Sequence, residues 1–121
     1  MIKREHYVLR IRDFYDDDMI KIITGIRRCG KSVILEQIMD EIKKKSSNII
    51  YLNFEDKKII SNIYDSDKLI EYVEKNRKEG RCYVFLDEIQ EVKNWSEACK
   101  TLRLYDNSIF ITGSNSKLLS K

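Results

Sequence analysis

The chain has 121 residues, 42% of them hydrophobic and 36% charged, which suits one globular domain with a core. Its 23 basic and 20 acidic residues leave a net charge of +3, too mild by itself to indicate nucleic-acid binding. No apolar run approaches the ~20 residues of a membrane span. One histidine excludes a metal site built on imidazoles, and three scattered cysteines argue against a disulfide framework. We therefore expect a cytoplasmic protein with no membrane partner.

Helix and strand patterns alternate along the first half of the chain. Apolar spacing predicts a helix over 4–15 and then a short buried strand over 19–24. After a glycine-bearing loop, apolar residues three and four apart predict a helix from Lys31 to about Lys45. A second apolar strand is expected over 48–54.

The second half continues the alternation. A helix is predicted over 66–79, with Ser66 or Asp67 as its N-cap and Gly80 as its left-handed stop. The segment 82–86 is apolar without alternation, which is typical of a parallel strand covered on both faces.

The last elements complete the pattern. Asn94 to Glu97 resembles a capping box that opens another helix, 108–112 predicts a fourth strand, and Ser114 or Ser116 can start a last helix. Because helices separate short apolar strands, we predict an α/β fold with a parallel sheet and right-handed crossovers.

The strongest functional signal is a phosphate-binding loop between the first strand and the next helix. Residues 25–32 read G-I-R-R-C-G-K-S and match G-x-x-x-x-G-K-[ST] at every fixed position. Such a loop points backbone N–H groups at phosphate oxygens, and the helix N-terminus adds partial positive charge. Lys31 can reach the terminal phosphates, and the Ser32 hydroxyl can ligate Mg²⁺. The predicted nucleotide-binding residues are Gly25, Ile26, Arg27, Arg28, Cys29, Gly30, Lys31 and Ser32.

Three of the four residues at variable positions of the loop carry a charged or reactive side chain. Arg27 and Arg28 either steer a polyphosphate or are ordinary solvated arginines, and the sequence leaves both interpretations open. Cys29 is best interpreted as a passive small residue.

Two carboxylates end the third predicted strand. The same arrangement occurs in nucleoside triphosphatases. By this analogy, Asp87 is expected to hold Mg²⁺ through water, and Glu88 is expected to orient and polarise the attacking water. The sequence D-E-I-Q differs from the D-x-x-G of GTPases, and no N-K-x-D guanine motif occurs, which favours ATP. A glutamate directly after the aspartate favours hydrolysis over transfer to a small molecule.

Two further strand ends carry polar residues. Either Thr112 or Ser114, at the end of the fourth strand, is expected to contact the γ-phosphate or the attacking water. Asn53 ends the second strand, and it either holds Glu88 in an unproductive orientation until a partner binds or is a solvated strand end.

Together these segments resemble one family of AAA+-type ATPases that is widespread in bacteria and archaea. The resemblance rests on I-T-G-I-R-R-C-G-K-S at 23–32, Y-L-N-F-E-D at 51–56, F-L-D-E-I-Q at 85–90, Trp95, and I-T-G-S at 111–114. It implies a P-loop NTPase fold of three αβα layers with strand order 2-3-4-1. In this order the fourth strand lies between the first strand, which leads into the phosphate loop (Walker A), and the third strand, which ends at Asp87 (Walker B).

Relatives in that family are longer. They continue into a fifth strand, a helical region and a C-terminal domain often suspected to be nuclease-like. The resemblance thus implies that residues 1–121 are an ATPase domain truncated before the fifth strand and the lid.

The expected function is ATP binding, with Mg²⁺ as cofactor, and ATP hydrolysis by a domain that acts on an unidentified macromolecule. Self-association through an open sheet edge is a further expectation. Two alternatives stay open: a non-catalytic nucleotide-binding switch, and the ATPase part of a DNA-associated nuclease with a DNA or protein partner.

Overall fold

One parallel sheet forms the centre of the protein. The computed structural model describes residues 15–16, 19–23 and 28–113, and within the range 28–32 it describes only the helical backbone. Four strands lie in this part of the chain: β1 (Lys21–Ile23), β2 (Ile49–Asn53), β3 (Cys82–Asp87) and β4 (Asn107–Thr112). All pairings are parallel and the order is β1-β4-β3-β2, so the predicted parallel α/β fold is confirmed. Read from the β2 edge, this order matches the one that the family resemblance implies.

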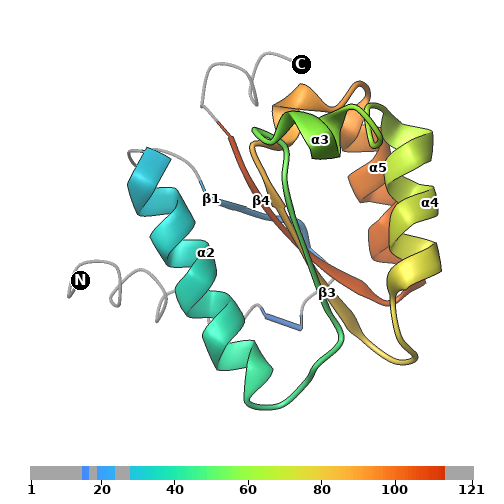
Figure 1. The fold of residues 1–121 in the computed structure, drawn as a ribbon. Coiled ribbons are helices and arrows are strands. Elements are labelled where there is room, and N and C mark those ends of the chain that lie inside the picture. The colour runs from blue at the N-terminus through green and yellow to red at the C-terminus, as the bar shows by residue number, and fades with distance from the viewer. Residues whose placement is uncertain (1–14, 17–18, 24–27, 114–121) are drawn as a thin grey trace.

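Helices cover both faces of the sheet. They are α2 (Arg28–Lys43), α3 (Lys57–Ile60), α4 (Ser66–Asn76) and α5 (Trp95–Leu102), with 3₁₀ turns η2 (Ile89–Glu91) and η3 (Arg103–Tyr105). Figure 1 shows α2 on one face and α4 with α5 on the other. No helix among the described residues is both long and apolar enough to cross a membrane.

Each face of the sheet has its own hydrophobic core. On the α2 side, Phe85 and Phe110 stack with ring centroids 4.5 Å apart beneath the apolar stripe of the helix. On the other side, α4 and α5 pack on the alternate residues of β2, β3 and β4. Every residue of β3 and β4 is buried, as the apolar run without alternation predicted for β3. Burial also raises the pKa of the Cys82 thiol to about 11, which suits a packing role.

The structure corrects three helix boundaries. Helix α2 begins at Arg28, three residues before the predicted start. Helix α4 begins after Asp65, whose Oδ1 accepts a hydrogen bond of 3.0 Å from Lys68 N, so neither Ser66 nor Asp67 is the cap. The extended backbone of Asp65 directs its carboxylate at the open N–H groups. The same helix ends at Asn76 because the next residue is extended, and Gly80, with φ of +88°, serves the following turn.

The predicted capping box at Asn94 is wrong. Asn94 has left-handed backbone angles (φ 59°) and its side chain makes no capping hydrogen bond, although α5 does begin at the next residue. The short helix α3 was not predicted, because four residues are too few to show a helical period. The predicted helix over 4–15, apart from its last residue, and the one starting at Ser114 or Ser116 lie outside the described residues.

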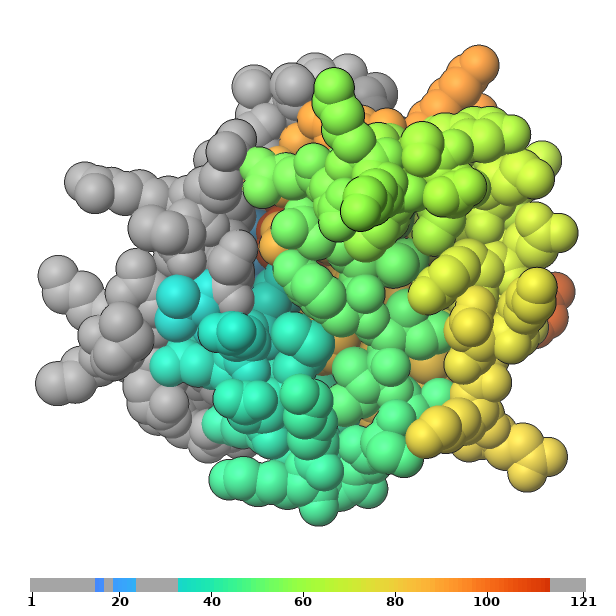
Figure 2. Space-filling view, viewed as in Figure 1, coloured from blue at the N-terminus to red at the C-terminus, as the bar shows by residue number. Residues whose placement is uncertain are grey.

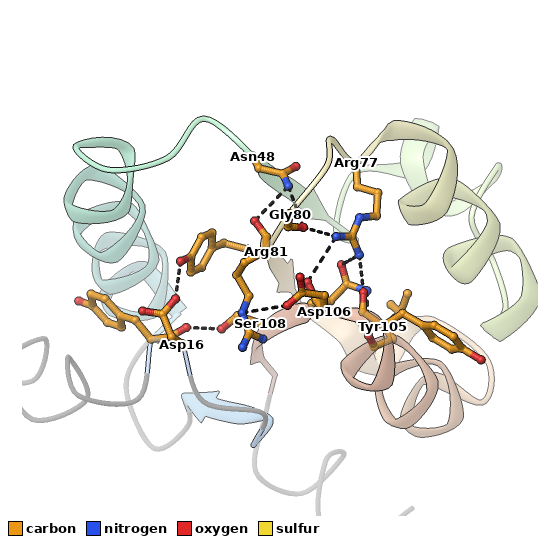
Figure 3. Close-up of polar contacts among 12 residues, drawn as sticks. Asp16, Asn48, Arg77, Gly80, Arg81, Tyr105, Asp106 and Ser108 are labelled. Atoms are coloured by element: carbon orange, nitrogen blue, oxygen red, sulfur yellow. Dashed lines mark hydrogen bonds and ion pairs between the residues drawn. The ribbon is translucent and has the colours of Figure 1, made fainter.

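A polar network secures the amino-terminal edge of the sheet (Figure 3). The Arg77 guanidinium donates to the Tyr105 carbonyl oxygen at 2.5 Å and to Asn107 Oδ1 at 2.8 Å. Asn48 Nδ2 donates to the Arg81 carbonyl oxygen at 3.0 Å, and Asn48 Oδ1 accepts from Lys78 N at 2.8 Å. These bonds satisfy backbone groups of the loops that lead into β3 and β4, so this edge has a structural role.

Candidate functional site

The carboxyl ends of all four strands lie at the opposite end of the sheet, which we call its carboxyl edge. The register pairs Ile23 with Thr112 and Asn53 with Asp87. In Figure 1 the first turn of α2, α3 and the end of β4 lie together at this edge. Ligands of parallel α/β sheets bind outside the carboxyl ends of the strands. The edge is therefore the natural place for a site.

The predicted phosphate loop begins at this same edge. Gly25, Ile26 and Arg27 lie outside the described residues, whereas their flanks, Ile23 and Arg28, end β1 and begin α2. The remaining loop residues Arg28, Cys29, Gly30, Lys31 and Ser32 form the first turns of α2. Their backbone therefore supplies a helix N-terminus, which favours anions, close to the carboxyl end of β4.

One buried hydroxyl joins the acidic pair. Thr112 is fully buried, and its Oγ1 donates to Asp87 Oδ1 at 2.5 Å. The same oxygen accepts a hydrogen bond of 3.0 Å from Glu88 N. Asp87 and Glu88 are only 4% and 6% exposed. The hydroxyl therefore fixes the orientation of the Asp87 carboxylate and the direction in which the chain leaves β3.

Asp87 has a second hydroxyl partner that the sequence did not reveal. Tyr51 OH donates to Asp87 Oδ2 at 3.0 Å from the neighbouring strand β2. Desolvation, and then the Asp87 charge, raise the pKa of the Tyr51 phenol above its ordinary value of 10.0, so the phenol keeps its proton and donates. The available signal was periodicity, because Tyr51 lies two residues before Asn53 and thus on the same face of its strand.

Glu88 adopts a backbone conformation that is uncommon for a residue with a side chain. Its φ of 58° is left-handed, which costs on the order of 1 kcal/mol and is often found at functional sites. Gln90 Nε2 donates to Glu88 Oε1 at 2.7 Å. The amide oxygen of Gln90 is buried and has no hydrogen-bond partner among the described residues. Gln90 follows Glu88 in the D-E-I-Q segment, but its spacing gave no reason to expect this contact.

Asn53 has a local partner. Its Oδ1 accepts a hydrogen bond of 3.0 Å from Glu55 N, which closes a turn after β2. The nearby Asp56 caps α3 by accepting from Lys58 N at 2.9 Å. The site thus brings Asp87, Glu88 and Thr112 together, whereas Asn53 joins them through the strand register alone, and Ser114 lies outside the described residues.

The donor set suits a hard divalent cation held mainly by other ligands. Asp87 offers carboxylate oxygens, which Mg²⁺ prefers. Among the described residues, no group of three or more His, Cys, Asp or Glu side chains is placed to hold a metal. Mg²⁺ commonly takes one or two protein ligands and fills its shell with water and substrate phosphates. The residues present therefore fit Mg²⁺ bound together with a polyphosphate.

A parallel α/β sheet with these features at its carboxyl edge is consistent with a P-loop-like nucleotide-binding domain of the AAA type. Comparison with known families gives the same class, since a family described as "AAA domain" matches residues 17–121. The chain belongs to this family, and membership indicates a nucleotide-binding, ATPase-like role.

Two curated relatives are similar in sequence. An uncharacterized protein of Haemophilus influenzae is 40% identical over 99% of this chain and 31% of its own length. An uncharacterized protein of Methanocaldococcus jannaschii is 43% identical over 84% of this chain and 22% of its own length. The chain therefore spans less than a third of either relative. No solved structure matches the chain.

Proposed function

We propose that this chain is an ATPase domain that binds ATP with Mg²⁺, hydrolyses it, and acts on a macromolecule. One observation carries the proposal. The acidic pair Asp87 and Glu88, tied together by Thr112, lies at the sheet edge where the G-x-x-x-x-G-K-S segment joins β1 to α2. Walker A and Walker B residues meet at such an edge in P-loop ATPases, and the family match supports the same reading.

The proposed roles follow from the chemistry of the side chains. The backbone of the loop and the Lys31 ammonium bind the phosphates, and Ser32 and Asp87 hold Mg²⁺, Asp87 through water. When bound, the metal ion would neutralise charge that develops on the phosphate oxygens. Thr112 keeps the Asp87 carboxylate oriented through the 2.5 Å bond to Oδ1.

Glu88 is proposed to accept a proton from the attacking water. In the structure its Oε1 accepts a hydrogen bond from Gln90 Nε2. This bond directs the carboxylate oxygen at the Gln90 amide. Turnover therefore involves a shift of Glu88 from this amide toward the water. The sequence left open whether Asn53 holds Glu88 or is a solvated strand end, and the geometry favours Gln90 for the holding role.

The test of nucleotide binding is Lys31→Ala with Lys43→Ala as its matched control. Both lysines belong to α2, but Lys43 lies in its last turn, far from the proposed phosphates. Calorimetry with Mg²⁺ and a slowly hydrolysed ATP analogue should show at least several-fold weaker binding for Lys31→Ala and unchanged binding for the control. Equal affinity in folded Lys31→Ala protein would contradict the loop assignment.

Hydrolysis needs its own measurement. Steady-state phosphate release by the whole protein that contains this domain should depend on Mg²⁺ and ATP. Tight Mg-ATP binding without phosphate release would contradict the hydrolytic part and leave a nucleotide-binding switch.

A further inference from the structure

Tyr51 combines exposure with a contact to a buried carboxylate. It lies in the middle of β2, which forms an edge of the described sheet, and is 42% exposed. Its ring lines a groove of about 880 Å³ between α2 and β2, together with Met39 and Ile49. Figure 2 shows α2 in cyan beside the green segment that contains β2. The phenol group reaches from this surface to Asp87 Oδ2, 36 residues away in sequence.

The two Asp87 oxygens accept hydrogen bonds from two different strands. Thr112 of β4 donates to Oδ1, and Tyr51 of β2 donates to Oδ2. The two hydroxyls therefore fix the rotation of the carboxylate.

We propose that Tyr51 is a positioning residue for the metal carboxylate Asp87, holding its Oδ2 in the orientation that Mg²⁺ binding requires. This inference rests on the proposed function. One side of the Tyr51 ring faces an open groove, so an aromatic ring without the hydroxyl would meet the packing requirement at this position. The phenol oxygen is the part of the side chain that reaches the site.

The test is Tyr51→Phe, which keeps the ring and removes the donor. The measurement is nucleotide-analogue affinity as a function of Mg²⁺ concentration, with thermal unfolding as a check on folding. We expect the Mg²⁺ concentration for half-maximal effect to rise roughly 10-fold, since a hydrogen bond to a charged group is lost. Affinity measured without Mg²⁺ should stay at the wild-type value, which a general packing defect would not allow.

The matched control is Tyr72→Phe. Tyr72 is a second partly exposed tyrosine, and it lines the groove of about 640 Å³ on the α4 side of β2. The Tyr72→Phe substitution should leave the Mg²⁺ dependence of nucleotide binding unchanged. An unchanged or lower Mg²⁺ requirement in Tyr51→Phe would overturn the inference while leaving the proposed function intact. Wild-type protein that binds no nucleotide at any Mg²⁺ concentration would instead refute the proposed function and the inference with it.

Discussion

Thr112→Val removes a single hydroxyl from the centre of the site and keeps the shape of the side chain. That hydroxyl donates to Asp87 Oδ1 at 2.5 Å and accepts from Glu88 N at 3.0 Å. Thr112 is completely buried, so water cannot replace the lost partners. The substitution therefore leaves a carboxylate oxygen without this donor and a backbone N–H without this acceptor.

The expected cost can be worked out bond by bond. A hydrogen bond to a charged group contributes about 1.5–3 kcal/mol, and a neutral one about 0.5–1.5 kcal/mol. Valine fills the same volume, so no cavity cost is added. The free energy of unfolding should fall by about 2–4.5 kcal/mol. Thr112→Ser keeps the hydroxyl and loses one buried methyl group, which should cost only about 1 kcal/mol.

Urea unfolding of the two variants and the wild type gives the comparison directly. Thr112→Val should be clearly less stable than Thr112→Ser, and it should also need more Mg²⁺ for nucleotide binding, because Asp87 is less well oriented. The reasoning is refuted if Thr112→Val is as stable as Thr112→Ser, since the two hydrogen bonds would then contribute nothing measurable.

Two further predictions concern Glu88 and Asp16. Glu88→Gln should retain Mg-ATP binding and lose about 10²–10⁴-fold in phosphate release, whereas Glu91→Gln should stay near the wild type; comparable turnover would place the base elsewhere. Hydrogen bonds from Lys45 and Tyr83 lower the pKa of Asp16 in the folded protein below its ordinary value of 3.8. These two hydrogen bonds therefore stabilise the fold above pH 3.8, and their contribution is lost as the pH falls through the lowered pKa of the folded state. Asp16→Asn should therefore destabilise the protein toward urea near neutral pH, by a margin that shrinks in acid; a margin independent of pH would contradict the argument.

The positions of the main site elements follow from sequence alone, for a topological reason. Parallel strands end at the same edge of a sheet, so polar residues directly after apolar runs meet there. Asp87 and Thr112 were predicted as strand ends, and the sheet places their side chains in hydrogen-bond contact. The unbroken apolar run of β3 likewise predicted a strand covered on both faces.

The partners of these residues were decided by tertiary structure. The phenol of Tyr51 reaches Asp87 because the β2–β3 register sets Tyr51 beside Phe85 and thus two residues from the carboxylate on the same face. Gln90, rather than Asn53, holds Glu88 because the left-handed backbone at Glu88 begins a 3₁₀ turn that brings the Gln90 amide to the carboxylate. Both contacts depend on how segments are placed in three dimensions: the register joins two strands that are distant in sequence, so the pattern of either strand alone does not identify its partner residues.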